Sequence, residues 1–435
     1  MTFTTLPVEA RRTVTWREPL AVAAGVANRD GALCLLSDPT QPGRRSFVAV
    51  EPDVMQVLQR VDGPLFDRVR AAGLEHGVVG LAAYDAGART ATGDRPAVWP
   101  DLILARYPAM LVFDHEAKTV QAVGRGVDAA SAEAACARAE AWLAEAIEPQ
   151  MPEAPSDNLE PQAGPEAYRA AVAEVVARIA AGDLFQANIA RGWTGRLKAE
   201  VDPFDVFLRL AAGGGSAFGA FWRIGDRALA SNSPELFLTW NPEDARVETR
   251  PIKGTRPRRS DPVADAAEAE ALSASAKDRA ENLMIVDLMR NDLSRVCVPG
   301  SVQVERLFEI ERLPTVHHLV STVTGALKPG LGAADLLEAT FPPGSITGAP
   351  KHQAMKVIAA LEPPRGAWCG SLFLLDDRGG LTASVLIRTA AFERGSDGWT
   401  WRAQAGAGIV ADSDPQAELE ETEVKFSALR RALIG

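Results

Sequence analysis

A proline-rich segment divides this chain of 435 residues into two parts. Four prolines fall between residues 148 and 164, at Pro149, Pro152, Pro155 and Pro161. Proline lacks a backbone N–H donor and favours extended chain, so the segment predicts a linker between folded parts. We therefore expect an N-terminal subdomain over residues 1–150, a linker over residues 151–164 and a larger domain over residues 165–435.

On both sides of this linker, strand patterns and helix patterns are mixed without a regular repeat. Apolar runs closed by turn residues predict strands, and proline at the start with glycine at the end predicts a helix over 165–182. We expect strands at 78–84, 109–114, 185–193, 216–224, 228–240, 246–252, 370–375, 381–393 and 399–409, and further helices at 129–147, 263–295 and 415–433. Because no βαβ repeat is visible, the fold class is predicted to be α+β.

Charge, hydropathy and cysteine content indicate the kind of partner and location. The formal net charge of −11 argues against nucleic acid as the main partner. No run approaches the ~18 apolar residues of a membrane span. Arg11 and Arg12 precede a short apolar run at residues 20–27, but Arg17 and Glu18 lie between them and the run, and Asn28-Arg29-Asp30 follows it, so no export signal is expected. The four cysteines are scattered, which predicts free thiols and a cytoplasmic protein.

One lysine lies between residues that favour a tight turn. It is Lys253, in the segment Arg250-Pro251-Ile252-Lys253-Gly254-Thr255-Arg256. A lysine amine becomes a nucleophile only where burial or a neighbouring charge favours its neutral form. The segment alone favours a solvated lysine near a turn, so a catalytic role depends on the residues that surround it in the fold.

Two predicted helices each carry a pair of acidic residues three positions apart. Asp278 and Glu281 share one face of the first helix, and Glu418 and Glu421 share one face of the second. Carboxylate oxygens from two helices are suitable ligands for a hard cation such as Mg²⁺. A solvated acidic face explains either pair alone, so the metal hypothesis depends on the two pairs facing each other.

Other segments could contribute to the same site. Glu235 follows a predicted strand in Ser233-Pro234-Glu235, and Arg388 is a lone cation in an otherwise apolar predicted strand, which predicts a carboxylate partner. The glycines of Gly406-Ala407-Gly408 would let backbone N–H groups approach an anion. The loop at residues 344–351 lacks the spacing of a phosphate-binding loop, so nucleotide binding is not expected.

Taken in order, these segments resemble the chorismate-utilising enzymes, which include anthranilate, aminodeoxychorismate, isochorismate and salicylate synthases. The resemblance covers about residues 165–430. Its motifs are Ser233-Pro234-Glu235, residues 251–255, residues 278–292, His318-Leu319-Val320-Ser321, residues 344–351, Ile387-Arg388-Thr389 and residues 406–425. It implies two packed antiparallel β-sheets flanked by helices, with the N-terminal segment intertwined with a chorismate-binding catalytic domain.

The resemblance also implies roles at the site. Glu281 and Glu421 look like direct Mg²⁺ ligands and Asp278 and Glu418 like water-mediated ones, with the metal holding the ring carboxylate. Glu235 resembles the general acid that assists departure of the ring 4-hydroxyl. The substrate-binding residues that it implies are Gln186, Thr255, His318, Thr347, Arg388, Gly406, Ala407, Gly408 and Lys425.

Two positions select a branch of this family. Water-adding members carry a water-activating lysine where this chain has Gln186, so an ammonia-using member is implied. Anthranilate synthases carry alanine where this chain has Lys253, whereas aminodeoxychorismate synthases carry lysine. In the mechanism proposed for that branch, the lysine adds at ring C2 and directs ammonia to C4, in the pathway to p-aminobenzoate and folate.

The sequence shows no glutaminase motif that would supply ammonia. None of the four cysteines lies in the GxCxGxQ setting of a glutamine amidotransferase, so a separate amidotransferase subunit, forming a heterodimer, is expected. Anthranilate synthase component I is an alternative, although Lys253 argues against it. A non-catalytic regulatory subunit that binds chorismate or an amino acid is a second alternative, although the expected acids are all present.

Overall fold

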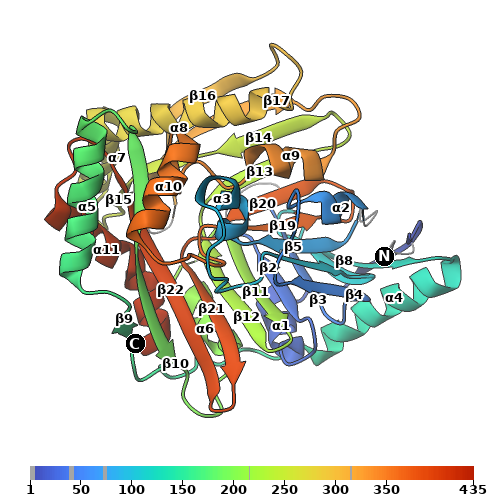
Figure 1. Ribbon diagram of the computed structural model, residues 1–435. Coiled ribbons are helices and arrows are strands. Elements are labelled where there is room, and N and C mark those ends of the chain that lie inside the picture. Colours follow the sequence, from blue (N-terminus) through green and yellow to red (C-terminus); the bar gives the residue numbers. More distant parts are fainter. Residues whose placement is uncertain (1–4, 39–43, 72–75, 215, 314–315) are drawn as a thin grey trace.

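Two large antiparallel β-sheets organise the chain (Figure 1). The structure, a computed structural model, describes residues 5–38, 44–71, 76–214, 216–313 and 316–435. Within these residues the first sheet has 12 strands. Their order is β1 (Val8–Val14), β8 (Thr119–Gly126), β7 (Ala109–Asp114), β3 (Arg45–Ala49), β2 (Leu33–Leu36), β11 (Phe218–Ile224), β12 (Arg227–Ser233), β21 (Thr389–Gly395), β22 (Gly398–Ile409), β10 (Gln186–Arg196) and β18 (Gly348–Ala349), with β9 (Glu160–Pro161) paired to β10.

The second sheet has 10 strands in the same described part of the chain. Their order is β15 (Ile252–Pro257), β17 (Val316–Ala326), β14 (Arg246–Arg250), β13 (Leu236–Trp240), β20 (Leu381–Val385), β19 (Ser371–Leu375), β5 (Val78–Ala82), β6 (Leu102–Arg106) and β4 (Val54–Leu58), with β16 (Gln303–Arg312) paired to β17.

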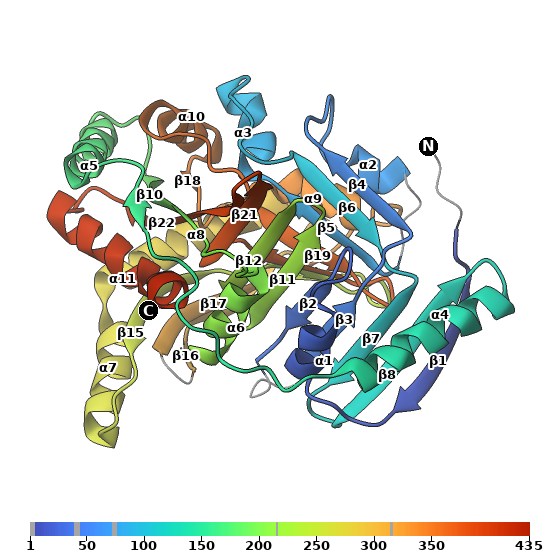
Figure 2. The ribbon, with the colours of Figure 1, turned by 90° about the horizontal axis from the view of Figure 1, so that it is seen from below.

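Helices cover the outer faces of both sheets. They are α1 (Pro19–Val26), α2 (Asp67–Ala71), α3 (Tyr84–Thr92), α4 (Ala129–Ala141), α5 (Pro165–Ala180), α6 (Pro203–Ala212), α7 (Pro262–Ala274), α8 (Ala276–Ser294), α9 (Ala333–Thr340), α10 (Lys351–Leu361) and α11 (Pro415–Ile434), and a 3₁₀ turn at Trp142–Glu145 follows α4. Figure 2 shows α4 lying along β8 and β1 at one end of the first sheet. In both figures α5 and α11 lie together at the other end.

Apolar side chains fill the space between the sheets. Leu33 and Trp222 of the first sheet join Leu81, Ile103 and Leu374 of the second in one buried cluster. Separate clusters join the first sheet to helices that include α4 and α6, and the second sheet to helices that include α8 and α9. The prediction of an α+β fold with two packed antiparallel sheets and flanking helices is confirmed.

Strands from both sides of the proline-rich segment build each sheet. β2 pairs with β11, and β5 pairs with β19. The proline-rich segment lies alongside β10. Within it, β9 pairs with Trp193 and Thr194, and Ser156 forms a bridge to Leu197, just beyond the end of β10. The boundaries 1–150, 151–164 and 165–435 stay predictions. The described part of the chain has no helix that combines the length and the apolar character required to cross a membrane.

Two predicted strands are interrupted where the chain crosses from one sheet to the other. The strand expected at 228–240 is β12 of the first sheet and β13 of the second, separated by Pro234, which has no N–H to donate. The strand expected at 381–393 is β20 and β21, separated by a turn in which Arg388 has φ +51°. The prediction of continuous strands was wrong because neither apolar pattern shows that the direction changes.

The single helix expected at 263–295 was also wrong. Ser275 has extended backbone angles, with φ −65° and ψ 109°, so α7 ends there and α8 begins. Its side chain accepts a hydrogen bond from the backbone N–H of Asp278 and thereby caps α8. As a result the acidic pair of α8 lies in its first two turns, at the end that favours negative charge.

Candidate active site

The two crossings between the sheets lie side by side and are hydrogen-bonded to each other. The Ser233 hydroxyl donates to the Val385 carbonyl at 2.5 Å, and the Val385 N–H donates to the Glu235 carbonyl at 3.1 Å. The Asn232 N–H donates to the carbonyl of Arg388, also at 3.1 Å. Glu235 and Arg388, which are far apart in the sequence, are therefore held at one place between the sheets.

Glu235 is a buried carboxyl group with an altered acidity. Glu235 is only 5% exposed, and this burial raises the pKa of its carboxyl group to about 7. The Ser345 hydroxyl, Lys253 and Lys425 act in the opposite direction, because each stabilises the carboxylate. A carboxyl group with this pKa can hold a proton near neutral pH and donate it.

Lys253 extends from β15 into the same region. Its side chain is 13% exposed, and its Nζ lies 3.8 Å from Oε2 of Glu281. A Cβ placed on Gly408 would lie 2.7 Å from this Nζ and 3.3 Å from Cδ of Gln186. A Cβ at 408 would therefore displace the lysine amine from its position above β22. Gly254, with φ +91°, allows β15 to approach α8 closely, since a Cβ there would lie 3.0 Å from Cβ of Asp278.

The acidic pairs of α8 and α11 face each other across a lysine. Nζ of Lys277 lies 4.0 Å from Oε1 of Glu281 and 3.9 Å from Oε1 of Glu418. Arg256 pairs with Asp278 at 3.0 Å. Among the described residues, no group of three His, Cys, Asp or Glu side chains is placed to hold a metal ion. Cationic side chains compensate these acids in the arrangement that the structure shows.

The second acidic pair is anchored to the end of β22. The Ser413 hydroxyl donates to Glu418 at 2.7 Å, and Lys425 pairs with Glu421 at 2.6 Å while donating to the carbonyl of Gly406 at 3.0 Å. Burial raises the pKa of Glu281 and of Glu418 above the usual range. Burial acts in the same direction on Glu421, but Lys425 beside it holds the pKa of Glu421 below the usual range.

Thr255 and His318 form a polar pair across β15 and β17. The Thr255 hydroxyl and Nδ1 of His318 are 2.9 Å apart, and Nε2 of His318 is buried without a partner among the described residues. Burial and the nearby charge of Arg388 lower the pKa of His318 to about 3. The imidazole is therefore neutral and can exchange one hydrogen bond with a ligand.

Arg388 does not have the carboxylate partner that the sequence predicted. Within the described residues no ion pair of 4.0 Å or less joins it to an acid, although the charge of Glu235 acts on it. The half-buried guanidinium loses solvation, and this lowers its pKa. The prediction was wrong because the strand turns at Arg388, so its charge acts on Glu235 and His318 without an ion pair, and the guanidinium stays available to an anion.

The remaining predicted residues belong to β10 and β22 or, for Thr347, to the loop that directly precedes β18. Gln186 is fully buried, and neither its Oε1 nor its Nε2 has a hydrogen-bond partner in the described structure. Thr347 donates its hydroxyl to the Pro343 carbonyl at 2.8 Å. The backbone of Gly406, Ala407 and Gly408 pairs with Ala190, Ile189 and Asn188 of β10. Ala407 packs its side chain into a core on the other face, so only its backbone can contact a ligand here.

A buried ion pair that the sequence did not predict supports this face of β10. Arg365 donates to Glu362 at 2.5 Å, to the Ile346 carbonyl at 2.9 Å and to the Asn188 carbonyl at 2.6 Å. Glu362 in turn accepts the N–H of Ala190 at 2.8 Å. Both side chains are almost fully buried. Their separation of three residues beyond α10 is the only sequence signal, and such pairs are common on exposed helices.

The fold and the site together define the class of protein. The chain belongs to the chorismate binding enzyme family, whose pattern matches residues 40–431. The aminodeoxychorismate synthase component 1 of Salmonella typhimurium is 41% identical over 82% of this chain and 76% of its own length. That of Escherichia coli (strain K12) is 40% identical over 88% of this chain and 83% of its own length.

Anthranilate synthases also match much of the chain. The anthranilate synthase component 1 of Streptomyces coelicolor is 44% identical over 60% of this chain and 50% of its own length. Among solved structures, anthranilate synthase component I from Streptococcus pneumoniae has a TM-score of 0.77 at 28% identity and covers 90% of this chain and 93% of its own. The menaquinone-specific isochorismate synthase of Escherichia coli has a TM-score of 0.76 at 18% identity, over 98% and 94% of the two chains, and this likeness concerns the fold alone.

Proposed function

We propose that this protein is component 1 of an aminodeoxychorismate synthase, which converts chorismate and ammonia to 4-amino-4-deoxychorismate. The relatives of that name support this proposal because they match 82% and 88% of the chain at 41% and 40% identity. The observation that carries it is the position of Lys253, whose Nζ lies over Gly408, next to Gln186 and 3.8 Å from Glu281. A primary amine is thereby held above the strand whose backbone would bind the substrate.

The residues can divide the reaction into two balanced displacements. In the first, Nζ of Lys253 bonds to ring C2, the two ring double bonds shift, and the C4–O bond breaks. Glu235, with a pKa of about 7, donates the proton with which the hydroxyl leaves as water. In the second, ammonia bonds to C4, the double bonds shift back, the C2–N bond breaks to release Lys253 as the neutral amine, and the new C4 ammonium group returns a proton to Glu235. The enolpyruvyl group is retained throughout.

Polar groups around this lysine would orient the substrate. Arg388 is available to a carboxylate, and the neutral His318 can accept or donate one hydrogen bond at the ring. Gln186 offers an amide, which cannot act as a general base, so activation of water at this position is disfavoured. The branch that uses ammonia is therefore favoured over the branch that adds water.

The experiment that tests this function identifies the product. The protein is incubated with chorismate, Mg²⁺ and an ammonium salt, and the ring position of the new amine is determined. We expect the 4-amino product from the wild type, and loss of that product from Lys253→Ala, by a factor of at least about 100. Lys356→Ala removes an exposed lysine of α10 and should leave rate and product unchanged. A 2-amino product from the wild type would instead identify an anthranilate synthase.

Magnesium is the cofactor that we propose for this site. Asp278, Glu281, Glu418 and Glu421 supply only oxygen donors, and Lys277 between α8 and α11 indicates that a cation is stable there. Glu281 and Glu421 would hold the ion directly, with Asp278 and Glu418 acting through water. When bound, the ion would neutralise and position the ring carboxylate.

Binding of Mg²⁺ can be measured without turnover. An ion that binds the folded state alone raises the unfolding temperature as its concentration rises. We expect this rise in the wild type and in Glu420→Gln, an exposed neighbour on α11, but not in Glu281→Gln or Glu421→Gln. Equal Mg²⁺-dependent stabilisation of all four proteins would contradict the assignment.

The ammonia donor that we propose is a glutamine amidotransferase subunit in a heterodimer with this chain. The name "component 1" of the relatives supports a second component. The product assay can be repeated with glutamine and a purified amidotransferase subunit in place of the ammonium salt. Glutamine-dependent amination, together with co-elution of the two chains, is the expected result.

A further inference from the structure

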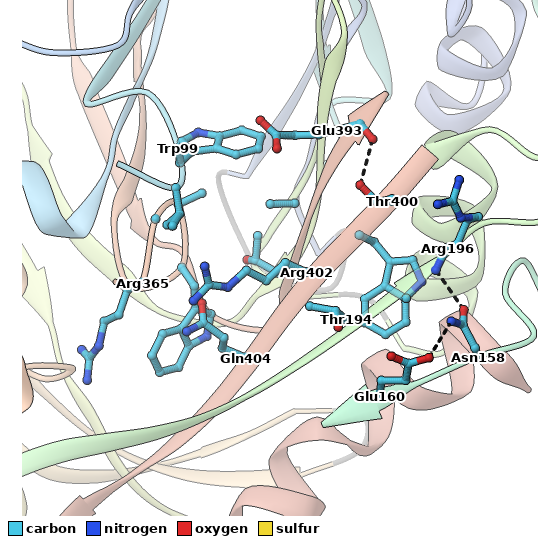
Figure 3. Close-up of a pocket in the computed structure, with 18 residues that line it drawn as sticks. Trp99, Asn158, Glu160, Thr194, Arg196, Arg365, Glu393, Thr400, Arg402 and Gln404 are labelled. Atoms are coloured by element: carbon cyan, nitrogen blue, oxygen red, sulfur yellow. Dashed lines mark hydrogen bonds between the residues drawn. The ribbon is translucent and has the colours of Figure 1, made fainter. Parts of the chain in front are cut away.

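A cavity apart from the catalytic site lies against the first sheet. It has a volume of about 500 Å³ and is bordered by β10, β21 and β22, by Trp99 and by the loop at residues 365–368 (Figure 3). Its walls include three tryptophans, Trp99, Trp368 and Trp401. None of the residues assigned above to the catalytic site lines it.

Two polar side chains of β22 reach this cavity without adequate partners. Gln404 is only 4% exposed, and its amide forms no hydrogen bond with any described residue. Arg402 is half-buried, donates one guanidinium N–H to the Pro364 carbonyl at 2.5 Å, and has a buried Nε without a partner. No carboxylate lies within 4.0 Å of Arg402 in the described part of the chain. The buried Nε of Arg402 lacks an acceptor, which costs free energy, so a ligand that supplies acceptors would be stabilised here.

The cavity and the catalytic site lie on the same face of β22. Side chains alternate along a strand, so Arg402, Gln404, Gly406 and Gly408 project to one side, and Figure 3 shows Arg402 and Gln404 doing so. A Cβ on Gly406 would lie 3.0 Å from Cη2 of Trp368, which therefore stands over this row between the cavity and Lys253. The indole separates two sites that share one strand.

The acids at the edge of the cavity do not pair with Arg402 in the described part of the chain. Glu393 pairs with Arg227 at 2.8 Å, and Glu160 accepts a hydrogen bond from Asn158 at 3.3 Å. The Nε–H of Arg402 and the amide N–H groups of Gln404 can therefore donate to a ligand, and the walls around them are aromatic. This combination selects a ligand with an anionic head and a flat apolar body.

We propose that this cavity is a second binding site, separate from the catalytic site, for a small planar carboxylate, with Arg402 and Gln404 binding the carboxylate and Trp368 contacting the apolar body. The proposal does not depend on the proposed reaction, because binding is measured without substrate. Since Trp368 borders both sites, a ligand in the cavity that shifts the indole would change its contact with Gly406.

Benzoate is the probe, and benzamide is its uncharged counterpart. Calorimetric titration of the wild type should show one benzoate site and at least about 10-fold weaker binding of benzamide, as expected for loss of a charge-assisted hydrogen bond. Arg402→Gln should weaken benzoate binding at least about 10-fold. Arg196→Gln, a matched change on β10 that lines the same cavity but removes an arginine paired with Asp397, should change it less than about twofold.

Gln404→Leu separates a binding role from a structural one. The amide has no hydrogen-bond partner among the described residues, so replacing it with leucine should leave the unfolding temperature equal or higher while weakening benzoate binding. Arg388→Gln, in the catalytic site, should leave benzoate binding unchanged within about twofold. Absence of saturable benzoate binding, equal binding of benzamide, or weakening by Arg388→Gln instead of Arg402→Gln would each overturn the proposal.

Discussion

At the scale of single residues, burial decides which chemistry each carboxyl group can perform. Glu235 and Glu421 are both glutamates near Lys425, yet the pKa of Glu235 is raised to about 7 and that of Glu421 is lowered. Glu235 lies between the sheets, whereas Glu421 lies on a helix with Lys425 at 2.6 Å. One environment favours the neutral acid, and the other favours the carboxylate.

The raised pKa of Glu235 makes protein stability depend on pH. Between pH 4.5, its ordinary value, and about 7, the folded protein retains a proton that the unfolded chain has released. The free energy of unfolding should therefore fall as the pH rises through this range, by up to about 3 kcal/mol from this group, and stay constant above it. Urea unfolding of wild type and Glu235→Gln at pH 5 and pH 8 measures the effect. An identical pH dependence in the two proteins would show that the carboxyl group is not perturbed.

Individual residues also show how far sequence alone can lead. Lys253, Glu235 and the acidic pairs could be named because their motifs are local. Lys277 could not, since its role between Glu281 and Glu418 requires α8 and α11 to face each other. Gln404 could not either, because an amide without a partner looks the same in a sequence as one with a partner.

At the scale of elements, the ion pair of Glu362 and Arg365 connects β10 to the loops that cover it. Arg365 also lies over the rings of Tyr84 and Trp368, at 4.5 and 5.0 Å from their centroids. With its hydrogen bonds to Glu362 and to the carbonyls of Ile346 and Asn188, the guanidinium has five contacts in all. These contacts hold α3, β10 and the Trp368 loop in one arrangement. We infer that Arg365 is a positioning group for the strand that carries Gln186 and Asn188.

Removing one member of this pair should destabilise the protein strongly. Arg365→Met leaves Glu362 buried without its partner, which should cost about 3–5 kcal/mol in the free energy of unfolding. The double variant Arg365→Met/Glu362→Leu leaves no isolated charge and should lose less than the single variant. Chemical denaturation of the three proteins tests this order. Additive losses would show that the two residues are not coupled.

The elements also explain which strand predictions failed. Strands β22 and β10 were predicted near their observed bounds because each stays in one sheet. The segments at 228–240 and 381–393 pass between sheets, and both of their halves are apolar because both are buried. An apolar pattern reports burial but not direction, so it cannot show a crossing.

At the scale of the whole molecule, neither side of the proline-rich segment contains a complete sheet. β11 would lose its partner β2, and β19 would lose its partner β5, if residues 1–150 were absent. Exposed edge strands favour association with other chains. A fragment of residues 165–435 should therefore aggregate or lack a cooperative unfolding transition, and the full chain should unfold in one transition. A soluble fragment that unfolds cooperatively would contradict this expectation.

The sequence by itself determined the α+β class, the family and the branch position at Lys253, because these depend on short motifs and on the order in which they occur. Only the tertiary structure decided where those motifs meet. The crossings at Glu235 and Arg388, the cation between α8 and α11, and the cavity beside Trp368 all join residues that are distant in the chain. The raised pKa of Glu235 and the pairing of Lys277 depend on residues that are distant in the sequence, and the local sequence does not show which of these residues lie nearby in the fold.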